Sequence, residues 1–274
     1  MNWYDTIGAG STTGAGNRLD DGHAMSGNAV MFDAKAGKIL TAGGAADYEN
    51  SDGRTNAYIV TLGAPKTTPT VTKIQSMAYA RGFANGVVLP NGKVFVTGGQ
   101  SRLQPFKDDT AQLTPELWDP TTGKWTQLNP IQVPRTYHSV EILLPDTTIF
   151  NGGVPESNHF DAEIFVPPYL LNTDGTRRTR PVISVVASSG RLGATLSITT
   201  AGTITKFSLV RSGTATHTVN MDQRRISLAS TEGGTAYTTT IPSDPGVALP
   251  GYWLLFAIDS SGTPNVGKAI KLVV

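Results

Sequence analysis

The stretches that decide the fold are NAVMFDAKAGKILTAGG at residues 28–44, GVVLPNGKVFVTGG at residues 86–99 and VEILLPDTTIFNGG at residues 140–153. Each combines an apolar strand, a turn, a second apolar strand and a Gly-Gly pair, and the pairs recur about every 54 residues. Further strands are expected at residues 56–62, 116–119, 123–126 and 163–166. Four strands in a unit of roughly 50 residues are typical of a kelch-type β-propeller blade. The sequence therefore predicts an all-β fold built from such blades.

The blades are predicted to occupy residues 1–178, which hold about three and a half repeat units. Such a number makes an incomplete ring, which leaves apolar blade faces and strand edges open to water. Two explanations stay open: other polypeptide completes the ring, or the chain is a piece of a longer one. Beyond the blades the repeat stops, and residues 179–274 carry short alternating strands that predict an immunoglobulin-like β-sandwich.

Composition excludes several functional classes. With 22 Lys and Arg against 21 Asp and Glu the net charge is +1, and no basic run is present, so no nucleic-acid partner is expected. The absence of Cys removes disulfides, thiolate metal ligands and cysteine nucleophiles. The sequence has no apolar stretch of about 18 residues, so no membrane partner is expected, and its N-terminus lacks the pattern of a signal peptide.

Tyr137 and His138 stand directly before the apolar strand that opens the third repeat. Aligning the repeats by their Gly-Gly pairs places residues 135–138 over residues 81–84, so these two side chains are additions to a shared blade position. The innermost strand of a blade lines the central channel, where its end can reach a ligand. Neighbouring strand residues face opposite ways, so both can serve one site only if the chain bends there. The alternative is that both only cap the strand.

His217 lies in a strongly polar stretch at residues 211–225, within an otherwise apolar sandwich. The stretch predicts a long projecting loop, and the alternative is a solvated hairpin. His23 and His159 are the other two histidines, and structural hydrogen bonding is the simpler interpretation for both. Two imidazoles and a phenol suit a transition ion such as copper better than magnesium or calcium.

Longer phrases resemble one known family. They are MNWY at residues 1–4, AMSGNAVMFDA at 24–34, RTYHS at 135–139, NHFDAEIF at 158–165, GTATHTVNMDQRR at 213–225 and VALPGYWLLF at 247–256. In these phrases the chain is similar to the galactose oxidase family of copper radical oxidases, nearly without gaps from Met1 to Val274. The resemblance implies a seven-bladed kelch propeller followed by a C-terminal early-set sandwich, one hairpin of which enters the propeller channel.

The resemblance also implies a site with one copper ion. The family's ligand positions fall on Tyr137, as the axial tyrosine and the base for the alcohol proton, on His138 and on His217. Its substrate-binding positions fall on Tyr48, Glu49, Phe83, Pro105 and Phe106. Glu49 stands where galactose oxidase has an amide, so a strict preference for galactose is not expected.

Departures from the family pattern are equally specific. The family's fourth ligand is a tyrosine joined by a thioether bond to a cysteine, and it belongs to earlier blades than those in this chain. Because the chain has no Cys, it cannot form this Tyr-Cys radical cofactor by itself. A Cys-x-x-Cys pair of the family is replaced by residues 153–157. Met1 corresponds to an internal methionine of the family, so the chain is expected to begin mid-enzyme.

The resemblance predicts the C-terminal portion of a secreted, extracellular copper radical oxidase that oxidises primary alcohols to aldehydes and reduces O2 to H2O2. Its expected partners are a primary alcohol or carbohydrate substrate, O2 and, as one alternative, the N-terminal half of the same enzyme. Because the Tyr-Cys cofactor is missing, the isolated chain is predicted to be inactive. The rival hypothesis is a non-catalytic secreted carbohydrate-binding or structural module that keeps the fold.

Overall fold

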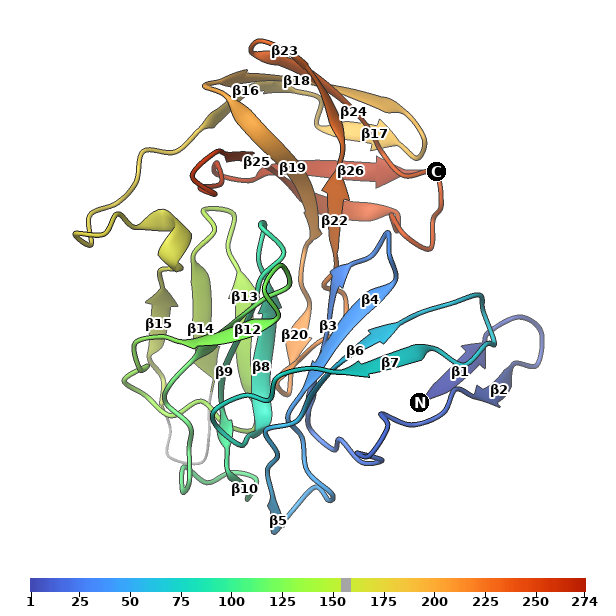
Figure 1. Cartoon of the computed structure of the whole chain (residues 1–274), viewed down its shortest axis with the longest axis vertical. Coiled ribbons are helices and arrows are strands. Elements are labelled where there is room, and N and C mark those ends of the chain that lie inside the picture. Colours follow the sequence, from blue (N-terminus) through green and yellow to red (C-terminus); the bar gives the residue numbers. More distant parts are fainter. Residues whose placement is uncertain (154–158) are drawn as a thin grey trace.

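The structure is a computed structural model that describes residues 1–153 and 159–274. Its regular elements are β-strands, and the 3₁₀ turn η1 (Pro168–Leu170) is the single helical element of the described residues (Figure 1). The predicted all-β fold class is therefore confirmed. No helix in this part of the chain is long and apolar enough to cross a membrane. Of the stretch that replaces the family's cysteine pair, residues 154–157 lie outside the described residues.

Three antiparallel sheets follow the three repeats, and their strands pair in chain order. Blade A is β3 (Asn28–Asp33), β4 (Lys38–Ala42), β6 (Ala57–Thr61) and β7 (Thr70–Lys73). Blade B is β8 (Gly82–Val88), β9 (Val94–Gln100), β11 (Glu116–Asp119) and β12 (Lys124–Gln127). Blade C is β13 (Ser139–Leu143), β14 (Ile149–Gly153) and β15 (Ala162–Phe165). The sequence did not predict β7, and blade C has three strands among the described residues.

Two small sheets flank the blades. A hairpin of β1 (Asn2–Asp5) and β2 (Ser11–Gly14) lies beside blade A, where the Trp3 indole N–H donates to the Thr67 carbonyl at 2.6 Å. The short strands β5 (Ser51–Asp52) and β10 (Arg102–Leu103) pair between the loops of blades A and B. Within the described part of the chain, no sheet closes the blades into a ring (Figure 1).

Apolar side chains pack the blades face to face. Between blades A and B, Phe32 meets Trp118 edge to face, with ring centroids 5.0 Å apart. Between blades B and C, Phe95 packs against Phe165 at 4.7 Å and against the buried Ile149. Residues on both faces of the inner strands β8 and β9 are buried, which is why these strands read as nearly continuous apolar stretches.

Backbone hydrogen bonds join consecutive blades at the Gly-Gly pairs. The Gly44 amide donates to the Arg81 carbonyl at 2.9 Å, and the Gly99 amide donates to the Arg135 carbonyl at 2.7 Å. Gly98, beside the second of these bonds, has a φ of +66°, and a Cβ there would lie 2.2 Å from the Arg135 oxygen. Only glycine fits this backbone conformation and this close approach. The repeated glycines therefore mark contacts between blades and are more than generic turn residues.

The same two arginines bind their own blades through their side chains. The Arg81 guanidinium donates to the Gly98 carbonyl at 2.9 Å, and the Arg135 guanidinium donates to the Gly153 carbonyl at 3.1 Å. Both arginines are fully buried. Blades B and C thus each begin at a buried arginine that holds the end of the blade's own second strand.

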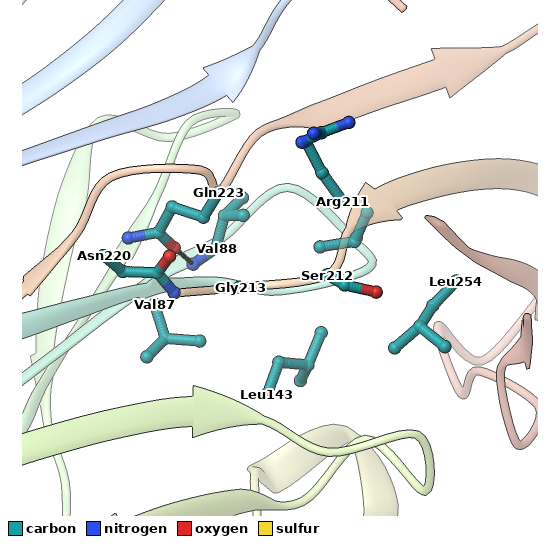
Figure 2. Close-up of a pocket in the computed structure, with 10 residues that line it drawn as sticks. Val87, Val88, Leu143, Arg211, Ser212, Gly213, Asn220, Gln223 and Leu254 are labelled. Carbon is teal, nitrogen blue, oxygen red and sulfur yellow. Dashed lines mark hydrogen bonds between the residues drawn. The ribbon is translucent and has the colours of Figure 1, made fainter. Parts of the chain in front are cut away.

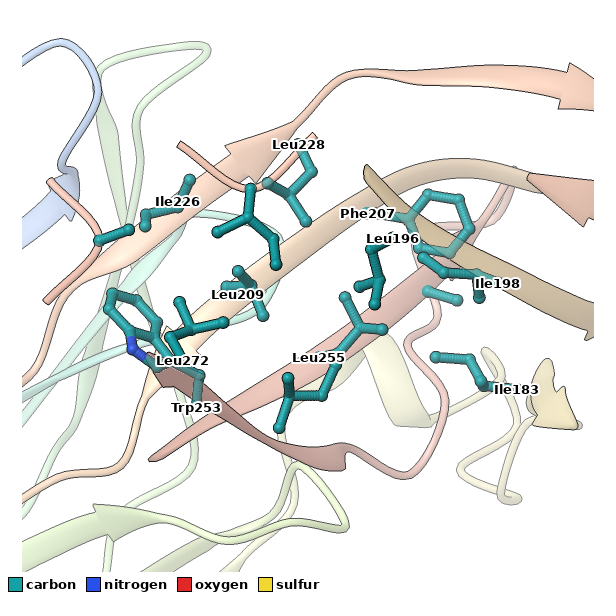
Figure 3. Close-up of a cluster of buried hydrophobic side chains, with 14 of the residues drawn as sticks. Ile183, Leu196, Ile198, Phe207, Leu209, Ile226, Leu228, Trp253, Leu255 and Leu272 are labelled. Atoms are coloured by element: carbon teal, nitrogen blue, oxygen red, sulfur yellow. The ribbon is translucent and has the colours of Figure 1, made fainter. Parts of the chain in front are cut away.

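The remaining strands form two facing sheets with one core. The first is β16 (Val182–Val186), β18 (Thr195–Ala201), β24 (Ala236–Thr240) and β23 (Ser230–Gly233). The second is β17 (Ser189–Arg191), β26 (Lys268–Val273), β25 (Gly251–Asp259), β19 (Ile204–Arg211) and β22 (Arg225–Leu228). Ile198, Phe207, Trp253 and Leu255 meet between the sheets (Figure 3). This packing makes a β-sandwich.

Buried hydrogen bonds fix the sandwich to the blades. The Pro90 carbonyl of blade B accepts from the Ser208 hydroxyl at 2.8 Å and from Nε of Arg225 at 2.7 Å. The Arg225 carbonyl accepts from the Ala34 amide of blade A at 2.9 Å. The sandwich therefore holds a defined position over blades A and B, from which it extends a hairpin along β8 and β13, the inner strands of blades B and C.

We expect Gly98→Ala to lower the free energy of unfolding by about 3 kcal/mol or more, because it combines a left-handed backbone with a clash against the Arg135 carbonyl. Gly123 is a matched control, since its φ is +70° but no atom lies within 4 Å of its Cβ position. Gly123→Ala should cost only about 1 kcal/mol. Urea unfolding followed by tryptophan fluorescence measures both values, and equal losses would contradict the explanation.

Candidate metal centre

Tyr137 and His138 lie at a sharp bend before β13. His138 has a φ of +70°, the left-handed conformation that reverses the ordinary strand direction. As a result the two neighbouring rings stack on each other, with centroids 4.0 Å apart and planes 29° apart, instead of facing opposite ways. The chain therefore bends at Tyr137 and His138, as it must if both side chains are to serve one site.

The strand register corrects the alignment of the repeats. Ala84 pairs with Gly98 in blade B, and Ser139 pairs with Gly153 in blade C. His138 therefore takes the place of Phe83, which also has positive φ (+55°), and not that of Ala84. Blade C has three residues between Arg135 and Ser139, one more than blade B has between Arg81 and the equivalent Ala84. Alignment on the Gly-Gly pairs hid this insertion, which is what allows two ring side chains to enter the site.

His217 is at the tip of a hairpin that leaves the sandwich. The short strands β20 (Ala215–Thr216) and β21 (Val219–Asn220) extend the hairpin away from the sandwich and between the blades (Figure 1). At the tip, His217 and Thr218 have φ values of +51° and +63°. The Thr218 amide donates to the Ser139 carbonyl at 3.0 Å, so the tip is bonded to the residue that follows His138.

The base of the hairpin is fixed by a buried glutamine. The Gln223 side chain accepts from the Val88 amide at 3.0 Å (Figure 2). It also donates to the Gly86 carbonyl at 2.6 Å. It thereby occupies backbone groups of β8 that no neighbouring strand uses. Sequence analysis missed Gln223 and the Ser139 carbonyl, because backbone-mediated docking leaves no pattern in the sequence.

Three ring side chains converge where the hairpin tip meets blade C. The centroids of His138 and His217 are 4.3 Å apart with planes at 87°, and those of Tyr137 and His217 are 5.8 Å apart. His217 is exposed, while Tyr137 and His138 are half-buried. The described residues hold no group of three or more His, Asp or Glu side chains that could bind a metal, so the phenol is the third donor that this chain offers.

The environment of His138 favours its neutral form, and a hydrogen bond orients the ring of His217. Burial, and secondarily the proximity of His217, lowers the pKa of His138 below its usual value, so this imidazole is neutral near pH 7. Nδ1 of His217 hydrogen-bonds the Thr216 hydroxyl at 2.7 Å. If Nδ1 donates this proton, the lone pair of Nε2 is free for a ligand, an arrangement common among metal-bound histidines.

Aromatic side chains surround Tyr137. Ring centroids of Phe106, Phe83 and Tyr48 lie 5.0, 5.1 and 5.7 Å from its own. Phe83 is fully buried, whereas Tyr48 and Phe106 are exposed on one side. Loss of hydration, the interaction with the Tyr137 hydroxyl and the nearby Glu49 carboxylate together raise the pKa of Tyr48 to about 12. The phenol of Tyr137 thus lies in an aromatic cup that is open toward solvent.

The other sequence-predicted residues lie at different distances from this cup. Glu49 is exposed beside Tyr48, and Pro105 is half-buried beside Phe106. His159 is not part of the cluster: its Nε2 pairs with the Asp108 carboxylate at 2.9 Å. The exposed His23 contributes its backbone carbonyl, which accepts from two arginines, Arg18 and Arg54.

This donor set fits copper. Imidazole nitrogens suit copper and zinc, and a phenolate oxygen is a harder donor that copper(II) also accepts. Calcium and magnesium prefer carboxylate and carbonyl oxygens, whereas two of the three donors in this cluster are imidazole nitrogens. His138, His217 and Tyr137 would hold the ion, with the first two as nitrogen donors.

Comparison with known proteins gives a consistent result. Residues 180–272 match the family described as galactose oxidase-like, early set domain. Galactose oxidase of Gibberella zeae is 49% identical over 284 residues, covering 99% of this chain and 42% of the relative. The aldehyde oxidase GLOX1 of Arabidopsis thaliana is 26% identical over 231 residues, covering 74% of this chain and 37% of the relative. The chain thus spans about two fifths of the length of these curated relatives.

A solved structure extends the likeness to the whole chain. It is described as a novel fungal alcohol oxidase of the AA5 family in complex with copper, and it superposes with a TM-score of 0.96 at 46% identity. The superposition covers 100% of this chain and 59% of that one. Both the blades and the sandwich therefore have counterparts in a copper-containing oxidase.

We expect the side chain of His138 to titrate below its ordinary pKa of about 6.5 in metal-free protein. In His217→Gln the pKa of His138 should rise, because the neighbouring charge is removed, but should stay low, because burial is the larger cause. Nuclear magnetic resonance of the imidazole signals against pH measures this. His159→Gln is the control and should leave the titration of His138 unchanged, and an unshifted value in His217→Gln would count against the contact.

Proposed function

We propose that this chain, which belongs to the galactose oxidase family and spans 42% of the Gibberella zeae enzyme, is the copper-binding C-terminal part of an alcohol oxidase. The proposed reaction is RCH2OH + O2 → RCHO + H2O2. Two electrons and two protons leave the alcohol and convert O2 to peroxide, so atoms and electrons balance. The substrate class is a primary alcohol, either simple, aromatic or carried by a carbohydrate.

One observation carries the proposal. Two imidazoles and a phenol from segments 79 residues apart in the sequence, His138 and His217 with Tyr137, meet within stacking distance at the end of one blade. A hairpin from the sandwich must enter between the blades to bring His217 there, and backbone bonds hold it at Ser139. A solvated hairpin would not need such docking, and strand capping would not require three converging rings.

The residues of this chain have separate roles in the proposed reaction. When bound, copper supplies an acceptor for one electron and polarises the alcohol oxygen. Tyr137 is the base that takes the hydroxyl proton of the alcohol. The rings of Phe106 and His138 pack on two sides of its ring, with centroids 5.0 and 4.0 Å from its own. This packing fixes the position of the phenol oxygen before substrate arrives.

The proposed substrate wall consists of Tyr48, Phe83, Pro105 and Phe106, with Glu49 at its edge. The wall is mainly aromatic, so it favours alcohols with an apolar or aromatic body. Glu49 accepts hydrogen bonds but cannot donate one when ionised, unlike an amide. We infer that this site prefers simple or aromatic primary alcohols over galactose.

The second electron requires a group that this sequence does not contain. The chain has no Cys, so a Tyr-Cys radical cofactor would have to come from polypeptide outside these 274 residues, such as the N-terminal half of the same enzyme. On this proposal the chain alone does not oxidise alcohols. An extracellular location, where family resemblance places such oxidases, completes the proposal.

Copper binding tests the proposed centre directly. We expect the full chain to bind one Cu²⁺ with nitrogen hyperfine structure in its electron paramagnetic resonance spectrum, because two imidazoles are available. His217→Ala should weaken copper binding by about 10-fold or more, because changing even the hydrogen-bond partners of metal ligands lowers metal affinity by about 10- to 100-fold. His159→Ala is the matched control and should bind copper like the unchanged chain.

Other results would reject the centre. Equal copper affinities of the His217→Ala and His159→Ala variants would mean that the hairpin histidine is no ligand. A chain that binds no copper at all would favour the non-catalytic carbohydrate-binding or structural module.

Glu49→Gln tests the proposed preference in an enzyme completed by the remaining blades. Restoring an amide should raise kcat/KM for galactose relative to benzyl alcohol by about 10-fold, because one donated hydrogen bond to a sugar hydroxyl is worth about 1–1.5 kcal/mol. Initial rates of peroxide release with both alcohols give the ratio. An unchanged ratio would remove Glu49 from the specificity argument.

A further inference from the structure

Blade C carries a row of polar side chains on the face that meets blade B. Glu141 of β13 pairs in register with Asn151 of β14, which pairs with Glu163 of β15. Directly paired residues of an antiparallel sheet project from the same face. The row therefore lies across all three strands, three residues beyond His138 along β13.

Most polar atoms of this row are buried without hydrogen-bond partners in the described part of the chain, although Oε1 of the half-buried Glu163 accepts from the Gln132 amide at 2.8 Å. Glu141 and Asn151 are each only 1% exposed. Among the described residues, neither oxygen of Glu141, neither polar atom of Asn151 and not Oε2 of Glu163 has a partner. Glu141 and Asn151 have complementary groups and face each other, yet they do not bond to each other. Leaving such groups unpaired costs about 1–3 kcal/mol each, so an occupant between them is expected.

Blade B adds a further buried oxygen to the same interface. The Asn85 side chain donates to the Ser139 hydroxyl at 2.7 Å, which shows that its face of β8 meets blade C. Thr97 pairs with Asn85 in register and shares that face. The Thr97 hydroxyl is fully buried and, within the described part of the chain, has no partner. Ser139 and Glu141 lie two apart on β13, so they point to the same side.

Blade architecture does not require this polar row. The equivalent positions in blade B are Gly86, Val96 and Glu116, which also pair in register. There the carboxylate is satisfied: Glu116 accepts from the Ala78 amide at 2.6 Å and from Arg81 at 2.9 Å. The glycine and valine leave no further polar atoms. Blade C has therefore replaced a satisfied, mostly apolar row with one rich in unpaired oxygens.

Charges around the row leave an excess of negative charge. Arg81 pairs with Glu116, and Arg135 pairs with Asp161 at 3.3 Å. Glu141 and Glu163 form no ion pair in the described residues. Burial raises the pKa of Glu141 well above its usual value, although Arg81 and Arg135 act in the opposite direction and Glu163 adds to the rise. A cation bound between these side chains would offset the free-energy cost of burying the Glu141 carboxylate.

We propose that the row binds a hard metal cation of the calcium class, held by the carboxylates of Glu141 and Glu163, the amide oxygen of Asn151 and the hydroxyl of Thr97. All four donors are oxygens, which calcium prefers and copper does not. The site is separate from the three-ring cluster. It joins blade B to blade C three residues farther along β13 than His138. Its function is to hold β13, and with it His138, at a fixed position relative to blade B.

Thermal unfolding of the full chain, stripped with a chelator, tests this site. Added 1 mM Ca²⁺ should raise the Tm by about 5 °C or more if the dissociation constant is near 10 μM, by mass action on the folded state. Mass spectrometry of the gel-filtered protein should find one calcium per chain. Glu141→Gln keeps the shape of the side chain and should abolish both effects, and Glu163→Gln should weaken them.

Asp109→Asn, which alters an exposed carboxylate, is the matched control and should keep the full calcium response. A calcium response that is equal in Glu141→Gln and Asp109→Asn would overturn the proposal, since it would come from surface binding. The proposal also fails if calcium changes nothing and the chelated chain loses stability from pH 5 to 8 while Glu141→Gln does not. In that case a proton on the buried Glu141 carboxyl, and not a cation, satisfies the row.

Discussion

The hydrogen bond from the Gly99 amide to the Arg135 carbonyl fixes where blade C begins, and the functional site depends on that point. Gly98, next to it, can have no side chain because the Arg135 oxygen occupies the space. The Arg135 side chain then binds Gly153, which pairs with Ser139 at the start of β13. The chain must turn between Arg135 and Ser139, and the residues in the turn include Tyr137 and His138. A contact between blades thereby becomes the support of a possible metal centre.

The second half of the site comes from the sandwich, and its position depends on a different set of bonds. Pro90 holds the sandwich strands at blade B, Gln223 holds the base of the hairpin on β8, and Ser139 holds its tip. These contacts are spread along the hairpin, so His217 is fixed even though it is exposed. Because the anchoring groups on the blades are mostly backbone atoms, the hairpin depends on blade geometry more than on the identity of blade side chains.

Local constraints explain what could be predicted from sequence. The apolar strands and the Gly-Gly pairs of the repeat report packing and close approach, so the all-β fold and most blade strands follow directly. The family phrases also brought out Tyr137, His138 and His217 as candidates. The one-residue insertion before Ser139 was not visible, because alignment on the Gly-Gly pairs places Gly152 over Gly98, whereas the strand register places Gly153 there. Glu141 was missed for a similar reason, since its neighbours across the sheet are distant in the sequence.

The same left-handed position recurs at the start of the first strand of each blade, or just before it. Ser26, Phe83 and His138 have φ values of +56°, +55° and +70°, and the Ser26 carbonyl accepts from the Phe83 amide at 2.9 Å. In a non-glycine residue this conformation costs about 1 kcal/mol or more, so it persists only where the surrounding structure enforces it. The blade contacts enforce it here whatever residue is present. One blade can therefore place an apolar wall at this position, as Phe83 does, and the next can place an imidazole, in the same left-handed backbone conformation.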